Sequence, residues 1–596
     1  SYSLVSWFAM LFAAGMGIGL VFWGVAEPLN HYASPPPGTP AGTSDAMKAQ
    51  EAMTTSFLHW GLSAWAVYIV VGLAIAYTVH RKGRKVSLRW ALEPLFGRHV
   101  RGWIGDVVDV FAIVGTLFGV AASLGFGASQ FSAGLEHLGI LQSNIWVLMV
   151  VIVIITSLAT CSVLSGLDRG IKWLSNTNLV LAAVLAIAVL LLGQPLFVLR
   201  EFVQTIGDYM SNFVSLSFRT LPYQGAPGET WLGSWTTYYW GWWISWSPFV
   251  GIFIARISKG RTVREFVAGV LAVPTLVTFL WFSIMGGTAL WQQLYGPGNI
   301  VSDGKVNSVT ALFEVLNHLP ANTVLVVGFL ILLVIFFVTS ADSAAFVVDM
   351  IATGGEQNPP VLTRVMWAVL GGGIAAVLLW GGASSGDLTA GLGALQTMTI
   401  LAAAPFSVVM VLACIATLRA FSREHRQRLK LENQILHREM AEHVVDKVTE
   451  QVTESVVDHL EDQVITVVDE SSDTRFRPGR DSRSGLNVRG LPSIVGALGQ
   501  DTVVEPAGLA LPELELVDVN AVSTPCRRAR YINTLEPGRG LGGCLKQLVT
   551  GDDGSRLPRR PRPYLAGPGT FGEVCLVLGA AESRHRAHRS HLAHQH

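Results

Sequence analysis

The chain has 596 residues, of which 51% are hydrophobic and 14% are charged, and its formal net charge at pH 7 is zero. Soluble domains usually contain about 25% charged residues, so this composition indicates a membrane protein. A neutral net charge gives no reason to expect a nucleic-acid partner. The five cysteines form no CxxC pair and no metal-ligand spacing, so the sequence predicts neither a disulfide framework nor a cysteine-rich metal domain.

Long apolar runs recur from the first residues to the middle of the chain. A spanning helix needs about 20 apolar residues. Ten segments satisfy this requirement: 2–28, 53–80, 102–133, 144–166, 170–194, 231–256, 264–291, 322–352, 362–382 and 390–418. The first run begins at once and has no signal-peptide pattern, so we expect a truncated N-terminus. The sequence therefore predicts an all-α polytopic membrane protein.

The loops between these spans alternate in their content of basic residues. Those after the second, fourth and sixth spans are rich in lysine and arginine, including Arg81, Lys82, Arg169 and Arg256, whereas the loops on the other side carry few. Basic loops stay in the cytoplasm. We therefore expect the first span to enter from the cytoplasm and the C-terminus to be cytoplasmic.

Ten spans divide into two sets of five, and because five is odd, the second set would be inverted. Inverted repeats with broken helices near the bilayer midplane recur in transporters. We expect one repeat over 1–194 and the other over 231–420, joined by an amphipathic linker helix over 195–230. The first span of each half carries a feature that weakens a helix, Gly15-Met16-Gly17-Ile18-Gly19 and Ser247-Pro248 respectively.

The C-terminal third changes character twice. Residues 421–470 are charged and keep a near-helical spacing of valines, which predicts a cytoplasmic helix that lies on the membrane, against a neighbouring subunit or in solvent. Residues 471–596 are rich in arginine, glycine and proline and show no helical or strand period. Disorder accounts for this tail, and so does out-of-frame translation of GC-rich DNA.

Aromatic residues gather in two of the predicted spans. On a continuous helix, Trp60, Trp65 and Tyr68 would lie at about 0°, 140° and 80°, within one broad sector. The sixth span carries a dense tryptophan cluster: Trp235, Trp240, Trp242, Trp243 and Trp246. An interfacial belt is one interpretation, but Trp243 and Trp246 lie deeper than a belt would place them.

An aromatic cage is the functional interpretation of these residues. A trimethylammonium group has no N–H to donate and is recognised by ring faces, each contact contributing about 0.5–2 kcal/mol. Such a cage is uncharged, so it needs no buried carboxylate at the bilayer midplane.

Two further motifs could bind the carboxylate of a substrate or a coupling cation. Alternating glycines at Gly15, Gly17 and Gly19 allow extended backbone, and they free amides for a substrate carboxylate and carbonyls for a cation. Small-residue helix packing is the alternative. The hydroxyls of Thr339 and Ser340 could complete a cation site, or bond back to their own helix.

Four stretches closely resemble the betaine/choline/carnitine transporter family: Gly15–Pro28, Trp60–Tyr68, Trp240–Arg261 and Phe336–Ser343. The resemblance covers about residues 1–420. It implies a LeuT-like fold of five plus five spans in the bacterial inner (plasma) membrane, with ten of the family's twelve spans present. Members of the family are typically homotrimers.

The resemblance also implies roles for individual residues. The cage would consist of Trp60, Trp65, Tyr68 and Trp243, and Trp242 and Trp246 would line the cytoplasmic exit. Gly15, Met16, Gly17 and Gly19 would contact substrate. One sodium site would use the carbonyls of Ala13, Met16 and Phe336 and the hydroxyls of Thr339 and Ser340. A second sodium site would use Thr116 and Phe249, but Val120 replaces a hydroxyl ligand there.

Gly19 favours betaine over choline. Some similar choline carriers place an aspartate at this position, where it would compensate the net positive charge of choline, whereas betaine brings its own carboxylate. We therefore expect a symporter for glycine betaine, with sodium as the coupling ion and no cofactor. Proton-coupled choline uptake, carnitine exchange and a membrane osmosensor are the alternatives. The membrane region contains no Ser-His-Asp set, metal cluster or phosphate loop, so an enzyme is not expected. The partners would be the substrate, membrane lipid and further copies of the chain.

Overall fold

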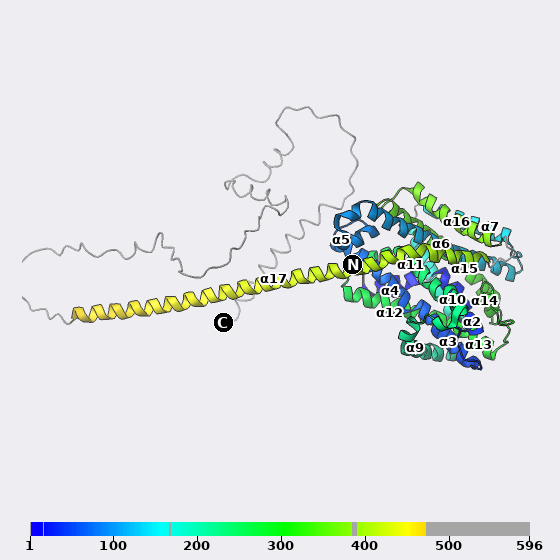
Figure 1. The fold of residues 1–596 in the computed structure, drawn as a ribbon, viewed down its shortest axis with the longest axis horizontal. Helices are drawn as coiled ribbons and strands as arrows, with labels where there is room; N and C mark the ends of the chain where they lie inside the picture. Colours follow the sequence, from blue (N-terminus) through cyan, green and yellow to red (C-terminus); the bar gives the residue numbers. More distant parts are fainter. Residues whose placement is uncertain (1, 16, 166–167, 384–389, 473–596) are drawn as a thin grey trace, which may run out of the picture. The chain divides into compact units, whose positions relative to one another are not determined.

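The computed structural model describes residues 2–15, 17–165, 168–383 and 390–472. Regular structure in these ranges is helical, apart from one isolated bridge between Ser302 and Lys305 (Figure 1). The predicted tail over 471–596 lies outside the described residues from 473 onward.

The helices of the first half follow one another with short connections. They are α1 (Leu4–Gly15), α2 (Ile18–Ala33), α3 (Asp45–Trp60), α4 (Leu62–Ala76), η1 (Tyr77–Arg81), η2 (Leu88–Leu92), α5 (Glu93–Phe96), η3 (Gly97–Arg101), α6 (Trp103–His137), α7 (Ile145–Ser165), α8 (Asp168–Leu192) and α9 (Pro195–Ser217).

The second half begins after α9. Its elements are η4 (Pro222–Gln224), α10 (Gly225–Ser234), α11 (Thr236–Ile257), α12 (Val263–Phe282), η5 (Ser283–Gly287), α13 (Thr288–Tyr295), α14 (Ala311–Asn317), α15 (Asn322–Ala352), α16 (Val361–Ala383) and α17 (Ala390–Ser472). Of the η segments, η1 and η5 are π-helical and the others are 3₁₀.

Eight helical segments of the described residues are long and apolar enough to cross a membrane. They are Asp45–Arg81, Trp103–His137, Ile145–Leu164, Leu174–Leu192, Val263–Tyr295, Asn322–Ala352, Val361–Ala383 and Ala390–Ile465. These segments confirm an all-helical, multi-pass membrane protein. The two remaining predicted spans, 2–28 and 231–256, are those in which we expected helix-weakening features.

The segment 2–28 is divided between two helices. Helix α1 ends at Gly15 and α2 begins at Ile18, and Gly17 between them is extended, with φ −166° and ψ 177°. Neither helix is long enough to span a bilayer alone, because each residue of a helix adds about 1.5 Å.

The expected break at Ser247-Pro248 is absent, because α11 continues through Pro248. Proline has no N–H for the preceding turn and leaves the carbonyl of residue 244 without its helical partner. The Ser247 hydroxyl donates to that Ile244 carbonyl at 2.7 Å. A local side-chain bond thus replaces the missing backbone bond, and the helix does not unwind.

The helices sort into an inner group and an outer group. In the inner group, α11 packs against α4, α6 and α17, and α2 packs against α3 and α6. Outer helices α7, α8 and α16 expose apolar side chains such as Val153, Val184 and Val377. Exposed apolar helix faces of this kind are accommodated by lipid.

Helix α17 joins the last span to the charged segment without interruption (Figure 1). At the junction, Glu424 accepts hydrogen bonds from the Tyr77 hydroxyl at 3.0 Å and the Lys82 ammonium at 2.7 Å. The hydrogen bond to Glu424 raises the pKa of Lys82 above its ordinary value. Residues 425–465 are exposed on every face of the helix.

Candidate functional site

The four rings of the expected cage lie in contact, although they come from three helices. The ring centroids of Trp60 and Trp243 are 4.8 Å apart, those of Trp243 and Tyr68 are 6.2 Å apart, and those of Tyr68 and Trp65 are 5.3 Å apart. All four side chains are buried. The three pairs meet edge to face, an arrangement that aromatic rings favour.

The geometry that brings Trp60, Trp65 and Tyr68 together is not the one expected. We expected one continuous helix, but α3 ends at Trp60 and α4 begins at Leu62, with Gly61 between them. The helical angles calculated for these residues therefore do not apply. A Cβ at Gly61 would lie 2.5 Å from the Phe57 carbonyl oxygen, which explains why glycine stands there.

The backbone groups freed at Gly61 are satisfied by side chains from other helices. The Trp243 indole donates to the His59 carbonyl at 2.8 Å, and the Thr278 hydroxyl lies 3.1 Å from the Trp60 carbonyl. The Leu62 amide donates to the Tyr209 hydroxyl at 3.3 Å. Buried polar backbone must find partners, and here one of those partners is itself a cage residue.

Trp242 and Trp246 extend the aromatic surface along α11 toward α6. Trp242 stacks on Trp243 with centroids 5.2 Å apart and planes 13° apart. The indoles of Trp242 and Trp246 both donate to the Gly119 carbonyl, at 3.4 Å and 3.1 Å respectively. Trp242 is buried, whereas Trp246 is half-buried.

The glycine motif places an open backbone segment beside these rings. Gly17 caps the start of α2 without a side-chain hydrogen bond, and, apart from its chain neighbours, no described residue lies within 4 Å of the position that a Cβ would occupy. At Gly19, a Cβ would lie 2.6 Å from Cη2 of Trp242 and 3.0 Å from Cη2 of Trp60. Gly19 therefore allows both rings to approach α2. Gly15 ends α1, and Met16 lies outside the described residues.

The residues expected to form the first sodium site are only partly described. Ala13 lies in α1, but its side chain and all of Met16 fall outside the description. On α15, the Thr339 hydroxyl donates to the carbonyls of its own helix, 2.8 Å from Ile335 O and 3.2 Å from Phe336 O. The Thr339 hydroxyl thus bonds to its own helix, which was the alternative to a cation-binding role. Ser340, the next residue, is half-buried.

The second sodium site has a similar arrangement. The Thr116 hydroxyl donates to the Ala112 carbonyl one turn earlier in α6, at 2.7 Å. Phe249 packs its ring against Trp246, with centroids 5.2 Å apart. Val120 is buried and contributes no hydroxyl.

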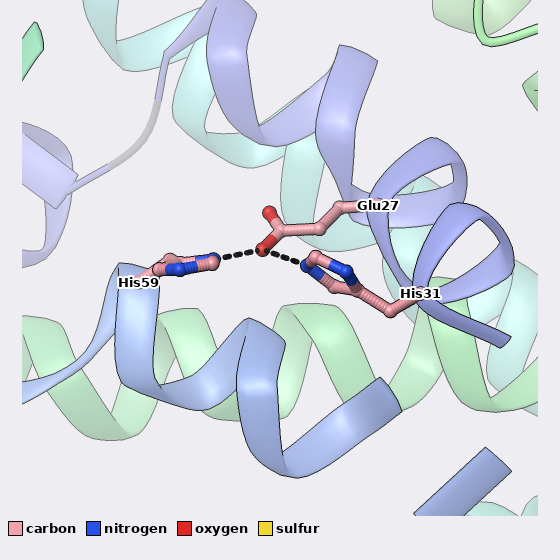
Figure 2. A group of neighbouring side chains, drawn as sticks. All are labelled: Glu27, His31 and His59. Carbon is pink, nitrogen blue, oxygen red and sulfur yellow. Dashed lines mark hydrogen bonds and ion pairs between the residues drawn. The ribbon is translucent and has the colours of Figure 1, made fainter. Parts of the chain in front are cut away.

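A buried carboxylate lies directly behind the cage, which the sequence analysis did not anticipate. Glu27 on α2 accepts the Trp60 indole N–H at 2.7 Å and the Tyr239 hydroxyl at 2.5 Å. Its other oxygen meets His59 Nδ1 at 2.7 Å and His31 Nε2 at 3.2 Å (Figure 2). The ligand atoms of Glu27, His31 and His59 all lie within 4.8 Å of one another.

This cluster corrects one expectation, the absence of a metal-ligand cluster from the membrane region, because its three side chains could hold an ion. One signal was present, because an acidic residue inside an apolar membrane segment marks function by default. Glu27 and His31 are also spaced as neighbours on one helix face. His59, however, reaches the cluster from another helix, and no local pattern predicts that.

The chemistry of these neutral rings suits a quaternary ammonium group, which aromatic ring faces recognise. The site also offers an open helix start for an anion, because amides at a helix N-terminus favour negative charge. The buried cluster of Glu27, His31 and His59 adds a titratable group next to Trp60.

Comparisons with known proteins agree with this chemistry. The family model described as "betaine/carnitine/choline family transporter" matches residues 1–426. An uncharacterized transporter of Mycobacterium tuberculosis is 53% identical over 423 residues, 70% of each chain. The glycine betaine transporter OpuD of Bacillus subtilis is 46% identical over 432 residues, 72% of this chain and 81% of that one. Among solved structures, a manganese transporter of Eremococcus coleocola overlaps 70% of this chain and 80% of its own at 14% identity, with a TM-score of 0.41, which is too loose to establish a common topology.

Proposed function

The chain belongs to the betaine/carnitine/choline family of transporters, and from this premise we propose that it is a secondary symporter that imports glycine betaine together with sodium. The observation that carries the proposal is the contacting set of rings formed by Trp60, Trp65, Tyr68 and Trp243. Ring faces recognise a trimethylammonium group without a hydrogen bond. The Bacillus subtilis relative named for glycine betaine transport supports the choice of substrate.

The carboxylate of betaine would bind at the start of α2. Gly17 is extended there and has open space beside it, and Gly19 lies against the rings of Trp60 and Trp242. The substrate's two charged ends would thus meet two different kinds of partner, amides for the carboxylate and ring faces for the ammonium group. Gly15 and Met16 would complete this segment.

Sodium would bind between the α1–α2 break and α15. The Phe336 carbonyl oxygen and the Thr339 hydroxyl oxygen lie 3.2 Å apart. One ion could contact both oxygens when the hydroxyl hydrogen turns away from the carbonyl. Ser340 and the carbonyls of Ala13 and Met16 would supply the remaining ligands. A second sodium at Thr116 and Phe249 belongs to the same proposal, although Val120 offers no oxygen there.

The fold proposed for this mechanism has ten spans in two inverted sets of five, with 195–230 as the linker and a cytoplasmic C-terminus. The eight long apolar helices support it, and the two other spans would be α1–α2 and α10–α11. A bacterial plasma membrane and a homotrimer are part of the proposal.

Uptake of labelled glycine betaine into proteoliposomes tests the proposal. We expect uptake under an inward sodium gradient. The variant Thr339→Val should raise the sodium concentration needed for half-maximal uptake without abolishing binding of betaine. Uptake driven only by a proton gradient, or uptake of choline but not betaine, would contradict the proposal.

A further inference from the structure

Glu27, His31 and His59 form a group of ionisable side chains, each at most 1% exposed (Figure 2). Glu27 and His31 come from α2, and His59 reaches the same carboxylate oxygen from α3. None of the three belongs to the cage, to the open helix start or to either sodium site. The transport chemistry described above leaves them without a task.

The hydrogen-bond geometry specifies how the protons are arranged in one state of this cluster. An ionised carboxylate accepts about four hydrogen bonds. Glu27 has four donors facing it, from Trp60, Tyr239, His59 and His31. Both imidazoles can fill these roles in their neutral form, and we assign each of them one N–H directed at Glu27. His59 Nε2 is then free to accept from the Thr236 hydroxyl, 3.1 Å away.

In that state the cluster carries one buried negative charge. Isolated buried charges are costly, so such a site gains by taking up a proton. His31 Nδ1 is a buried nitrogen without a hydrogen-bond partner among the described residues, which leaves one nitrogen available to a proton. Because the three groups share one oxygen, the proton belongs to the cluster as a whole and not to a single residue.

A metal ion fits this geometry less well than a proton. A metal bound at the shared oxygen would have to displace the N–H groups of His31 and His59, which now face Glu27 at 3.2 and 2.7 Å. It would also leave a net positive charge in an apolar interior, whereas one proton makes the cluster neutral.

Other titratable groups face the cluster from neighbouring elements. The phenol of Tyr239 donates to Glu27, and Tyr238 lies beside Tyr239 with ring centroids 5.3 Å apart. The guanidinium of Arg219, which follows α9, interacts electrostatically with both imidazoles. Arg219 is itself ion-paired with Glu51 at 3.6 Å, so its charge is already compensated.

The cluster is joined to the cage by two contacts. The Trp60 indole donates to Glu27 with one edge, and its ring lies 4.8 Å from Trp243. Tyr239 stacks on His59 at 4.7 Å and on Trp243 at 5.8 Å. The charge on Glu27 therefore acts at short range on a ring that would hold the substrate's ammonium group.

We propose that Glu27, His31 and His59 form a proton-binding site whose protonation weakens the binding of quaternary-ammonium substrates in the cage. The site rests on the proposed function, since it acts on the same rings. When the cluster is unprotonated, its negative charge attracts the ammonium group and orients Trp60 and Tyr239. Proton uptake from solvent neutralises the cluster and removes its attraction for the ammonium group. Linkage is reciprocal, so substrate binding releases protons.

The substrate's own charge sharpens this inference. Choline carries a net positive charge, whereas betaine is a zwitterion whose carboxylate offsets part of the attraction. Protonation should therefore weaken choline binding more than betaine binding.

Binding of glycine betaine and choline to the purified full chain, measured from about pH 5 to pH 8 where histidine titrates, tests the site. We expect affinity for both to fall with decreasing pH, choline more steeply, with no more than tenfold loss per pH unit. Calorimetry in buffers of different ionisation enthalpy should record proton release on binding. This measurement uses the unmodified protein and does not depend on whether a variant folds.

Two variants assign the effect to the cluster. Glu27→Gln should give weak binding that no longer depends on pH. Glu201→Gln, on α9, is the matched control, because the Glu201 carboxylate accepts from Thr205 at 2.6 Å and has no part in the cage. That variant should keep the pH dependence of the unmodified chain.

Affinity that does not change with pH, without proton release, would overturn the proton site and leave the transporter proposal standing. The absence of binding at every pH would overturn both. Zinc that binds the chain and abolishes betaine binding, in a manner lost in His59→Gln, would assign the three residues to a metal and overturn the proton site.

Discussion

The two helix breaks beside the cage differ in what closes them. At Gly61, the freed groups are bonded by Trp243, Thr278 and Tyr209 from three other helices. At Gly17, α2 begins without a side-chain cap, and among the described residues none except its chain neighbours lies near the position of a Cβ. A break closed by the protein fixes geometry, whereas a break left open can receive a ligand. The comparison therefore favours an architectural role for Gly61 and agrees with the substrate-binding role proposed for Gly17.

The largest effect should come from Trp243, because this residue is both a wall of the proposed cage and a hydrogen-bond donor at the Gly61 break. Trp243→Ala removes a cage wall and the donor to the His59 carbonyl. Replacing a buried tryptophan by alanine costs about 3–5 kcal/mol of folding stability, so we expect a large drop in melting temperature together with loss of betaine uptake. Trp243→Phe keeps an aromatic ring but loses the indole N–H, so this variant should still bind betaine but unfold at a lower temperature than the unmodified chain. Unchanged uptake in Trp243→Ala would remove Trp243 from the cage.

Gly61→Ala should destabilise the protein by about 1–3 kcal/mol, as overpacking in a core does. The added Cβ would meet the Phe57 carbonyl oxygen at 2.5 Å and Phe279 at 2.7 Å. Thermal unfolding in detergent measures the change. A melting temperature equal to that of the unmodified chain would show that this break is not held as tightly as its contacts indicate.

Gly17→Ala is the matched substitution at the open break, and it should give the opposite pattern. Apart from the chain neighbours, no residue in the described part of the chain lies within 4 Å of the new Cβ, and the extended backbone accepts alanine. We expect an unchanged melting temperature but a loss of betaine affinity of about tenfold, because a methyl group would occupy space reserved for ligand. Lost stability with unchanged affinity would reverse the assignment of the two breaks.

Thr278→Val should have the smallest effect. It removes a hydroxyl that is shared between the carbonyls of Trp60 at 3.1 Å and Thr275 at 2.9 Å. One such hydrogen bond contributes about 0.5–1.5 kcal/mol. The expected result is a small decrease in melting temperature, with betaine affinity nearly unchanged. A large loss of affinity would mean that Thr278 contacts substrate.

The sequence predicts the aromatic residues of the cage better than the backbone that arranges them. Indoles and phenols in membrane helices are conspicuous, and their types already point to ammonium recognition. The break at Gly61 depends on contacts with α9, α11 and α12, so a single glycine in an apolar run does not reveal it. Conversely, Ser247-Pro248 has the local signature of a break, but the Ser247 hydroxyl repairs the helix.

The same limit applies to the polar groups of the site. Hydroxyl and carbonyl ligands are chosen by orientation, and at Thr339 the hydroxyl faces its own helix. Glu27 is visible in the sequence as an acid in an apolar segment, but its partners His59, Trp60 and Tyr239 come from α3 and α11. Their meeting is a property of the tertiary fold.

The most direct test of the central claim is calorimetric binding of glycine betaine beside 3,3-dimethylbutanoate, which has the same shape but a neutral tert-butyl group in place of the trimethylammonium group. Cation–π contacts contribute about 0.5–2 kcal/mol each, so the account predicts that betaine binds at least tenfold more tightly and that Trp243→Ala removes most of the difference. Equal affinities for the two ligands would contradict recognition by an aromatic cage.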